Sequence, residues 1–124
     1  MPKRILLVDD NSIVRRQLRF YLETATGFEV CGEAINGRDA IEKALELSPD
    51  LIILDFTMPV MNGLEAGKTL RSMMPEVPLI LFTVHRSANL DSDASVAGIN
   101  AVISKVEGVT ALIDRVRSLL LEPA

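Results

Sequence analysis

The 124-residue sequence has a single cysteine, a single histidine and no tryptophan, and these scarcities exclude several kinds of active site. Without a cluster of Cys and His residues, the chain offers no zinc site of the usual ligand types. A nucleophilic cysteine would need a neighbouring base, and His85 is the only histidine in the chain. We therefore interpret Cys31, which lies in an apolar alternating stretch, as a buried structural thiol.

The sequence also lacks an excess of basic residues and any long apolar run. A net charge of -4 disfavours direct contact with nucleic acid, and we interpret Arg15, Arg16 and Arg19 as one solvated helix face. No apolar run approaches the roughly 20 residues that span a bilayer. The N-terminal run 5–8 ends at two aspartates and is too short for the core of a signal peptide. We therefore expect a cytoplasmic protein without membrane contact.

Short apolar runs alternate with helical patterns along the whole chain, as in a parallel sheet covered on both faces. We expect strands at residues 4–8, 28–33, 51–54, 79–82 and 101–104, each followed by a helix. The helix from Ser87 to Ala97 has few apolar anchors, whereas the last helix is strongly amphipathic. The length suits one domain over residues 1–124, and the predicted fold class is α/β with an open, doubly wound parallel sheet.

The spacing of apolar residues predicts which helix faces are buried. In the first helix, which Asn11 or Ser12 can cap, these residues are Val14, Leu18, Tyr21 and Ala25. In the second helix they are Ala40, Ile41, Ala44 and Leu45.

Polar residues follow four of the predicted strands directly. They are Asp9 and Asp10, Asp55, Thr83 and Lys105. In an open parallel sheet, ligands bind beyond the carboxyl ends of the strands, so these side chains can meet in one pocket. Two carboxylates about 4 Å apart repel by roughly 4 kcal/mol at an effective dielectric of about 20, so the cluster calls for a cation. Oxygen ligands with one lysine suit Mg2+ and a phosphorylated group.

The order and surroundings of these residues resemble the receiver domains of two-component response regulators. The resemblance rests on Asp9-Asp10, on the run Asp55-Phe56-Thr57-Met58-Pro59-Val60-Met61-Asn62-Gly63-Leu64-Glu65, on Thr83, and on Lys105 preceded by Ala97-Gly98. It covers essentially the whole chain and implies a flavodoxin-like (βα)5 fold with strand order 2-1-3-4-5. It also implies a Mg2+-dependent signalling switch that catalyses only its own phosphorylation and dephosphorylation.

The resemblance implies a role for each matching residue. Asp55 is similar to the phosphoacceptor of the family. Asp10 and Asp55 would ligate Mg2+ directly, together with the backbone carbonyl of Thr57, whereas Asp9 would act mostly through a coordinated water.

Thr83 and Lys105 resemble the residues that contact the phosphoryl group, each through a different oxygen. The expected phosphodonor is a sensor histidine kinase or a phosphotransfer protein, and the expected target is an output domain or a partner protein. Because the sequence ends shortly after the last helix, we expect a single-domain regulator or part of a longer one. A phosphorylation-dependent homodimer through the helix from Val109 to Leu121 is a further option.

Two positions depart from the family pattern. Many members have Tyr or Phe three residues before the lysine and Pro after it, whereas this chain has Val102 and Val106. We therefore hypothesise that the switch works without a swinging aromatic ring, through the segment from Thr83 to Ala97, whose helix is poorly anchored. Thr57 and His85 could flank the path of the water that hydrolyses the acyl phosphate.

Three other functions fit part of the pattern. A haloacid-dehalogenase-like phosphatase also uses a strand-end Asp with Mg2+, but it would need Asp-x-Asp where this chain has adjacent aspartates. A flavodoxin-like FMN carrier would need a Ser/Thr/Gly-rich phosphate loop in place of Asp9-Asp10-Asn11. A receiver used as a constitutive interaction module stays open, although the intact Asp, Thr and Lys positions favour phosphorylation.

Overall fold

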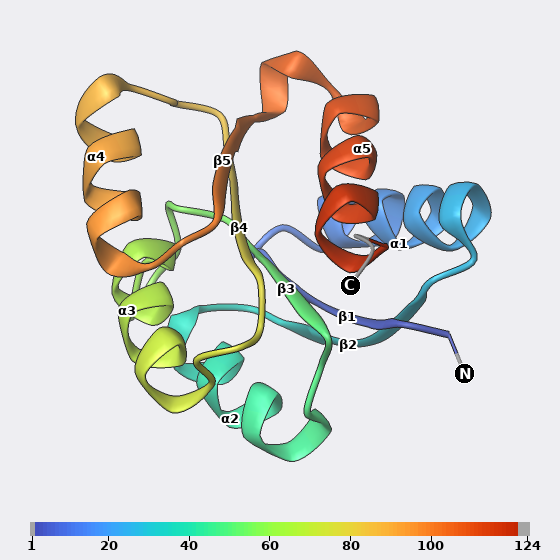
Figure 1. The fold of residues 1–124 in the computed structure, drawn as a ribbon, viewed down its shortest axis with the longest axis horizontal. Helices are drawn as coiled ribbons and strands as arrows, with labels where there is room; N and C mark the ends of the chain where they lie inside the picture. Colours follow the sequence, from blue (N-terminus) through green and yellow to red (C-terminus); the bar gives the residue numbers. More distant parts are fainter. Residues whose placement is uncertain (1, 122–124) are drawn as a thin grey trace.

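Five strands form the central sheet of the computed structural model, which describes residues 2–121 (Figure 1). The strands are β1 (Arg4–Val8), β2 (Glu29–Ala34), β3 (Leu51–Leu54), β4 (Leu79–Thr83) and β5 (Ala101–Ser104). All neighbouring pairs are parallel and the order is β2-β1-β3-β4-β5, which confirms the predicted order. Every residue of β3 and β4 is buried, because helices cover both faces of the sheet.

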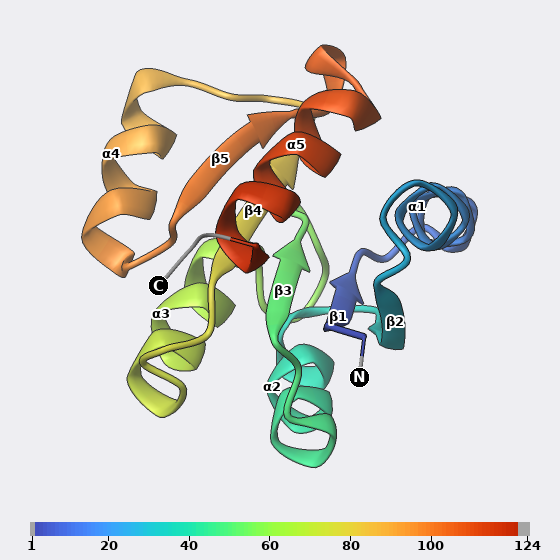
Figure 2. The ribbon, with the colours of Figure 1, turned by 45° about the vertical axis from the view of Figure 1, so that its right-hand side comes forward.

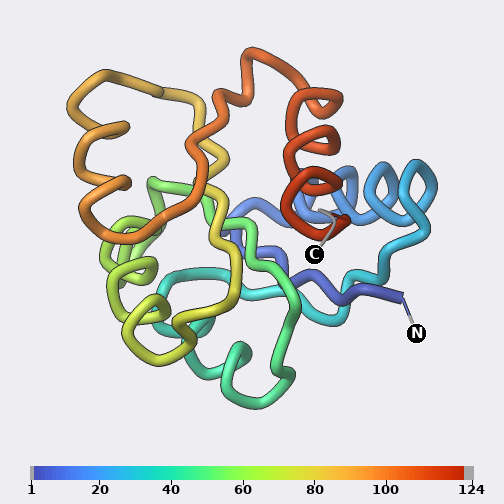
Figure 3. Tube along the Cα trace, viewed as in Figure 1, coloured from blue at the N-terminus to red at the C-terminus, as the bar shows by residue number. Residues whose placement is uncertain are grey.

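The helices that cover the sheet are α1 (Ser12–Thr26), α2 (Gly37–Leu47), α3 (Gly63–Met73), α4 (Ala88–Ala97) and α5 (Val109–Leu120), with a short 3-10 helix, η1 (Lys105–Glu107), before α5. One hydrophobic cluster joins the sheet to α1 and α5, and a second joins it to α2, α3 and α4. Figure 2 shows the two groups of helices on opposite sides of the sheet. The trace in Figure 3 passes through successive strand–helix units, which confirms the doubly wound α/β class. Within residues 2–121, no helix is both long and apolar enough to cross a bilayer.

Side-chain caps start the helices directly after the loops that follow the strands. Asn11 accepts hydrogen bonds from two N–H groups in the first turn of α1, at 2.9 and 3.2 Å, so Asn11 rather than Ser12 is the cap. Asn62 and Glu65 form a reciprocal capping box at the start of α3. These bonds satisfy N–H groups that have no partner within the helix. They also fix the loops after β1 and β3, which carry the predicted acidic residues.

The buried stripe of α1 differs from the predicted one. Leu18 and Leu22 are the buried residues of this helix, whereas Tyr21 is 46% exposed and Ala25 is also exposed. Tyr21 packs edge-on against the exposed ring of Phe20, with the ring centroids 5.5 Å apart. Neighbouring i, i+4 rows share the helical period, so the period alone does not determine which row faces the sheet.

Smaller differences concern single residues and boundaries. Leu45, predicted on the apolar face of α2, is exposed, because the small residues Ala40 and Ala44 occupy the sheet side of that helix. Cys31 is half-buried rather than buried; its Sγ lies 3.5 Å from the carbonyl oxygen of Ile5, and burial raises the pKa of its thiol. Strand β2 begins one residue later than predicted, β4 includes the next residue, and η1 was not predicted.

Candidate functional site

The carboxyl ends of β1 and β3 bring three aspartates together. Val8 and Leu54 are partners in the parallel register, so the residues that follow them, Asp9 and Asp55, leave the sheet side by side. One carboxylate oxygen from each of Asp9, Asp10 and Asp55 lies within 4.8 Å of the other two. Asp9 and Asp55 are 4% and 9% exposed, whereas Asp10 is exposed. The structure therefore places the predicted acidic residues in one cluster.

Lys105 reaches this cluster from the far end of the chain. Its Nζ lies 2.9 Å from Oδ2 of Asp9 and 3.6 Å from Oδ2 of Asp55. Thr83 is buried at the end of β4, where it pairs in register with Ser104, the residue before Lys105. β4 lies between β3, which precedes Asp55, and β5, which precedes Lys105. Thr83, at the end of β4, therefore belongs to the strand between them. The strand-end residues predicted from the sequence thus share one edge of the sheet.

Three carboxylates and one lysine leave the cluster with excess negative charge. Burial raises the pKa of Asp55 most, and the charge of Asp9 raises it further, while Lys105 and the N–H of Phe56 act in the opposite direction. A cation at the cluster would relieve this repulsion. The donors are all oxygen atoms, which Mg2+ and Ca2+ prefer. The residues present therefore fit a metal ion, and the three aspartates form the group that could hold it.

Thr57 and His85 are exposed residues on the loops after β3 and β4. His85 and Phe56, the neighbour of Thr57, line the same groove of about 360 Å³. Both loops therefore contribute to the walls of this groove. Their influence on the attacking water stays a prediction.

Val102, which stands where the resemblance implies an aromatic side chain, is half-buried in β5. A groove of about 260 Å³ opens beside it, with Arg86, Asp91 and Arg115 in its walls. Arg86 pairs with Asp91 at 3.1 Å and with Glu107 of η1 at 3.7 Å. Exposed ion pairs thus connect the loop before α4 to the turn after β5.

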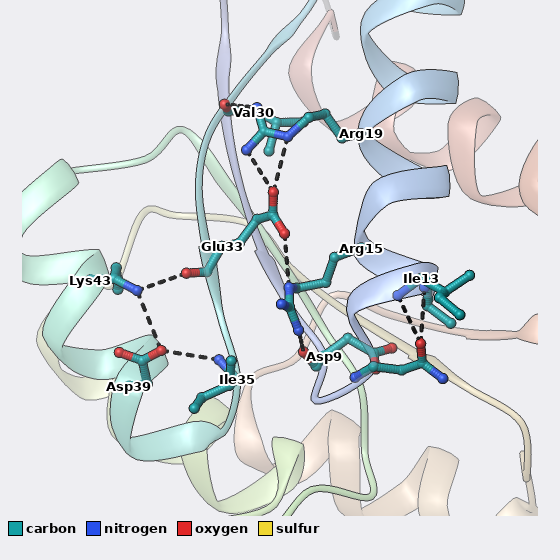
Figure 4. A network of polar contacts seen from close by, with 11 residues as sticks. Asp9, Ile13, Arg15, Arg19, Val30, Glu33, Ile35, Asp39 and Lys43 are labelled. Carbon is teal, nitrogen blue, oxygen red and sulfur yellow. Dashed lines mark hydrogen bonds and ion pairs between the residues drawn. The ribbon is translucent and has the colours of Figure 1, made fainter.

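The sequence-based interpretation misses a polar network beside the acidic cluster (Figure 4). Glu33 of β2 accepts hydrogen bonds from Arg15 at 2.8 Å and from Arg19 at 2.8 and 3.0 Å. Arg15 also donates to the backbone carbonyl of Asp9 at 2.7 Å. The interpretation of a solvated arginine face is therefore wrong for Arg15, whose side chain is 14% exposed. It holds for Arg16, which is exposed, and in part for Arg19, whose side chain is both bound and 37% exposed. The i, i+4 spacing of the two bound arginines was the available signal, because it places them on one side of the helix.

Glu33 is expected to make folding stability depend on pH in the acidic range. Burial alone would raise the pKa of Glu33, but hydrogen bonds and charges from Arg19 and Arg15 outweigh burial and lower that pKa below its ordinary value. A carboxyl with a lowered folded pKa stabilises the fold above its unfolded pKa, about 4.3, and loses this contribution as the pH falls through the folded pKa. The difference in unfolding free energy between wild type and Glu33→Gln should therefore be constant near neutral pH and shrink below about pH 4.3. Urea unfolding over this range measures the difference; a difference that does not change with pH would contradict the prediction.

Val60, in the loop between β3 and α3, has a φ of 71°, which is unfavourable for a β-branched residue. Its side chain is 75% exposed, so its removal costs little packing. Val60→Gly is expected to raise the free energy of unfolding by about 1 kcal/mol, because glycine adopts positive φ without steric cost. Urea unfolding measures the change. Val106→Gly is the control, since Val106 is even more exposed and has no positive φ; an equal gain in both variants would refute the strain argument.

Known proteins match the chain in sequence. A model of the response regulator receiver domain matches residues 5–117. The chemotaxis protein CheY of Thermotoga maritima is 40% identical over 105 residues, which cover 85% of this chain and 87% of CheY. The response regulator VraR of Staphylococcus saprophyticus is 35% identical over 117 residues, which cover 94% of this chain and 56% of VraR. The chain thus spans about half the length of VraR and most of the length of CheY.

Solved structures match the chain in fold. The response regulator domain of Thermotoga maritima CheB superposes with a TM-score of 0.90 at 27% identity, with complete coverage of both chains. A CheY-like receiver domain protein from Methanospirillum hungatei gives the same TM-score at 25% identity, over 98% of this chain and 96% of that one. Together with the sequence matches, these likenesses confirm the resemblance indicated by the motifs. The chain belongs to the family of response regulator receiver domains.

Proposed function

We propose that Asp55 accepts a phosphoryl group from a sensor histidine kinase or a phosphotransfer protein and that the product switches the chain's interaction with a partner. The observation that carries this proposal is the meeting of Asp55 with Asp9, Asp10 and Lys105 at one edge of the sheet. A carboxylate oxygen of Asp55 would attack phosphorus in line with the P–N bond of a phosphohistidine. As the new P–O bond forms, the P–N bond breaks and its electron pair stays on the imidazole nitrogen.

Mg2+ is the proposed cofactor. Asp10, Asp55 and the backbone carbonyl of Thr57 would hold it directly, and Asp9 would act through a coordinated water. When bound, Mg2+ supplies positive charge that offsets the carboxylates and the phosphoryl oxygens. The oxygen-only donor set and the raised pKa of Asp55 support this assignment.

Thr83 and Lys105 are proposed to hold the transferred group. The Thr83 hydroxyl would donate to one phosphoryl oxygen, and the Lys105 ammonium would pair with another. Lys105 is already 3.6 Å from Asp55, so a small movement brings it to a phosphoryl group there. A water that later attacks phosphorus would break the bond to the Asp55 oxygen and regenerate the carboxylate with inorganic phosphate as the product.

The proposal extends to the chain as a unit. Residues 1–124 would form one cytoplasmic receiver domain that acts on an output domain or a separate partner protein, without direct contact with nucleic acid or membrane. A phosphorylation-dependent homodimer through α5 is part of the proposal. The signal would leave through the segment from Thr83 to α4, because residues 84–89, which follow the buried Thr83 and lead into this helix, are all exposed. Equal amide hydrogen exchange of α4 with and without a phosphoryl mimic would exclude this route.

Intact-mass spectrometry after incubation with acetyl phosphate and Mg2+ tests the proposed function. The folded protein should gain the mass of one phosphoryl group, and a chelator that removes Mg2+ should prevent the gain. A folded protein that takes up no phosphoryl group, either from acetyl phosphate or from a phosphorylated phosphotransfer protein, would contradict the proposal. A constitutive interaction module would then be the better assignment.

Replacing Thr57 or His85 by Ala is expected to shorten the lifetime of the acyl phosphate without preventing its formation. Both side chains are exposed; His85 lines the groove and Thr57 follows Phe56, which lines it, so a smaller residue at either position should widen the path of the attacking water. The change should reach about tenfold, which corresponds to roughly 1.4 kcal/mol in the barrier. The decay of the adduct, followed by intact mass, measures it, with Val96→Ala on the exposed face of α4 as the control. Unchanged decay rates in both loop variants would rule the idea out.

A further inference from the structure

We propose that Arg15, held in place by Glu33, is a positioning residue that fixes the segment Asp9–Asp10 of the acidic cluster. The inference rests on the proposed function, in which these two aspartates hold Mg2+. It concerns side chains of α1 and β2 that lie outside the cluster. We infer that these side chains orient the two aspartates in addition to joining a helix to a strand.

Arg15 makes two hydrogen bonds that connect β2 to the loop after β1 (Figure 4). Its Nε donates to Oε1 of Glu33 at 2.8 Å, and a terminal nitrogen donates to the carbonyl oxygen of Asp9 at 2.7 Å. The side chain of Arg15 is 14% exposed and that of Glu33 is 30% exposed. Because the guanidinium is planar and rigid, two bonds at its opposite edges fix its orientation. The Glu33 carboxylate and the Asp9 carbonyl are therefore held in fixed positions relative to each other.

The carbonyl that Arg15 binds lies in the peptide unit between the two aspartates. This unit is planar, so a tilt of the Asp9 carbonyl also turns the N–H of Asp10 and moves the two residues relative to each other. The other polar atoms of Asp9 are held too: its N–H donates to a carbonyl of β2, Oδ1 accepts from the N–H of Asn11, and Oδ2 accepts from Lys105. Because Asp9 is buried, removing the guanidinium leaves its carbonyl short of a partner.

Glu33 receives enough hydrogen bonds to keep Arg15 oriented. Arg19 donates through Nε and a terminal nitrogen to Oε2 of Glu33, which leaves Oε1 for Arg15. Arg19 is itself held by a bond to the carbonyl oxygen of Val30 at 3.1 Å. Glu33 cannot turn away from Arg15 without breaking its bonds to Arg19. Such charge-assisted bonds are stronger than neutral ones and more specific in direction.

Lys43 offers a matched control because it forms the same kind of bridge on the other side of β2. Its Nζ donates to the carbonyl oxygen of Glu33 at 2.8 Å and pairs with Asp39 at 3.3 Å. Like Arg15, it links a carboxylate to a main-chain carbonyl. Figure 4 shows it on the side of α2, away from Asp9. Its removal should therefore disturb local packing without reaching the acidic cluster.

Calorimetric titration with Mg2+ separates positioning from simple stabilisation. Arg15→Met keeps the apolar stem and removes the donors, and it is expected to raise the Mg2+ dissociation constant about tenfold, as for other groups that orient metal ligands. Glu33→Gln should raise it by a smaller factor, roughly threefold, and Arg15→Lys should recover part of the affinity. Lys43→Met should leave it unchanged. Without Mg2+, amide exchange at Asn11, which donates to the Asp9 carboxylate, should be faster in Arg15→Met than in Lys43→Met.

All variants are measured well below their unfolding midpoints, so a loss of stability alone leaves the dissociation constant unaltered. Equal Mg2+ affinity and equal Asn11 exchange in Arg15→Met and Lys43→Met would overturn the inference, even if the wild-type chain binds Mg2+ and is phosphorylated. A wild-type chain that binds no Mg2+ would instead overturn the proposed function. The exchange measurement still tests whether Arg15 positions the loop in that case.

Discussion

Asp55→Asn is expected to abolish the adduct that acetyl phosphate forms in the presence of Mg2+. The amide has nearly the shape of the carboxylate but offers no anionic oxygen to attack phosphorus. The neighbouring carboxylates should not take its place, because Asp9 is bound to Lys105 at 2.9 Å and Asp10 is exposed at the edge of the cluster. Intact-mass spectrometry of the variant beside wild type measures the loss. An adduct of undiminished yield would show that the nucleophile is another residue.

The same variant should be at least as stable as wild type. Burial and the charge of Asp9 raise the pKa of Asp55, which means that its ionised form is disfavoured in the folded chain. An acid whose folded pKa is raised lowers stability at pH values above its unfolded pKa, and a neutral Asn removes that effect at pH 7. Asp50→Asn, at the opposite end of β3, is the control and should still form the adduct. A variant at Asp55 that loses both the adduct and the fold would not be informative about chemistry, and urea unfolding identifies it.

Gly63→Ala is expected to lower the free energy of unfolding by about 3 kcal/mol, at the upper end of the range for overpacked sites. Gly63 is the first residue of α3, and a Cβ there would overlap the carbonyl oxygen of Asp55 and lie 2.8 Å from a methyl group of Leu81. The oxygen belongs to the main chain between a buried strand and a capped helix, so it can shift only at a large cost in free energy. Urea unfolding measures the loss. The shift forced on Asp55 should also slow formation of the adduct.

Gly67→Ala tests whether the effect is specific to the contact with Asp55. Gly67 lies one turn later in α3, and a Cβ there would approach the terminal methyl group of Ile99 at 2.7 Å, which a side-chain rotation can relieve. Alanine is favoured over glycine within a helix by about 1 kcal/mol, which offsets part of that cost. The control should therefore change stability by much less than Gly63→Ala. Equal destabilisation of both variants would assign the effect to helix packing in general.

The sheet and the site residues could be predicted from sequence because both depend on simple local patterns. The run from Leu51 to Leu54 is wholly apolar and is buried on both faces, as a central parallel strand requires. Once five such strands are parallel, their carboxyl ends share an edge, so Asp9, Asp55 and Lys105 had to approach one another. The roles of these residues in phosphoryl transfer are predictions that the adduct experiments test.

Features that depend on how one helix is rotated, or on a single backbone angle, could not be predicted in this way. Leu22 is buried and Tyr21 is not, although both fit an amphipathic helix. Arg15 looked like a surface charge because nothing in the linear order places it opposite Glu33, which lies on a different element. The positive φ of Val60 is unfavourable for a valine side chain, so residue propensities could not predict it.

The hydrogen bond from Lys105 to Asp9 joins residues 96 positions apart, and this distance has a consequence for biosynthesis. Contacts between remote residues form late, because the intervening chain must first lose its freedom. A nascent polypeptide that ends before β5 would already carry Asp9, Asp10 and Asp55 but would lack their lysine. On the proposed function, such an unfinished chain would be a poor acceptor for the kinase. The chain would thus become an efficient phosphoryl acceptor only after β5 and Lys105 have been synthesised, and truncated products of translation would not signal.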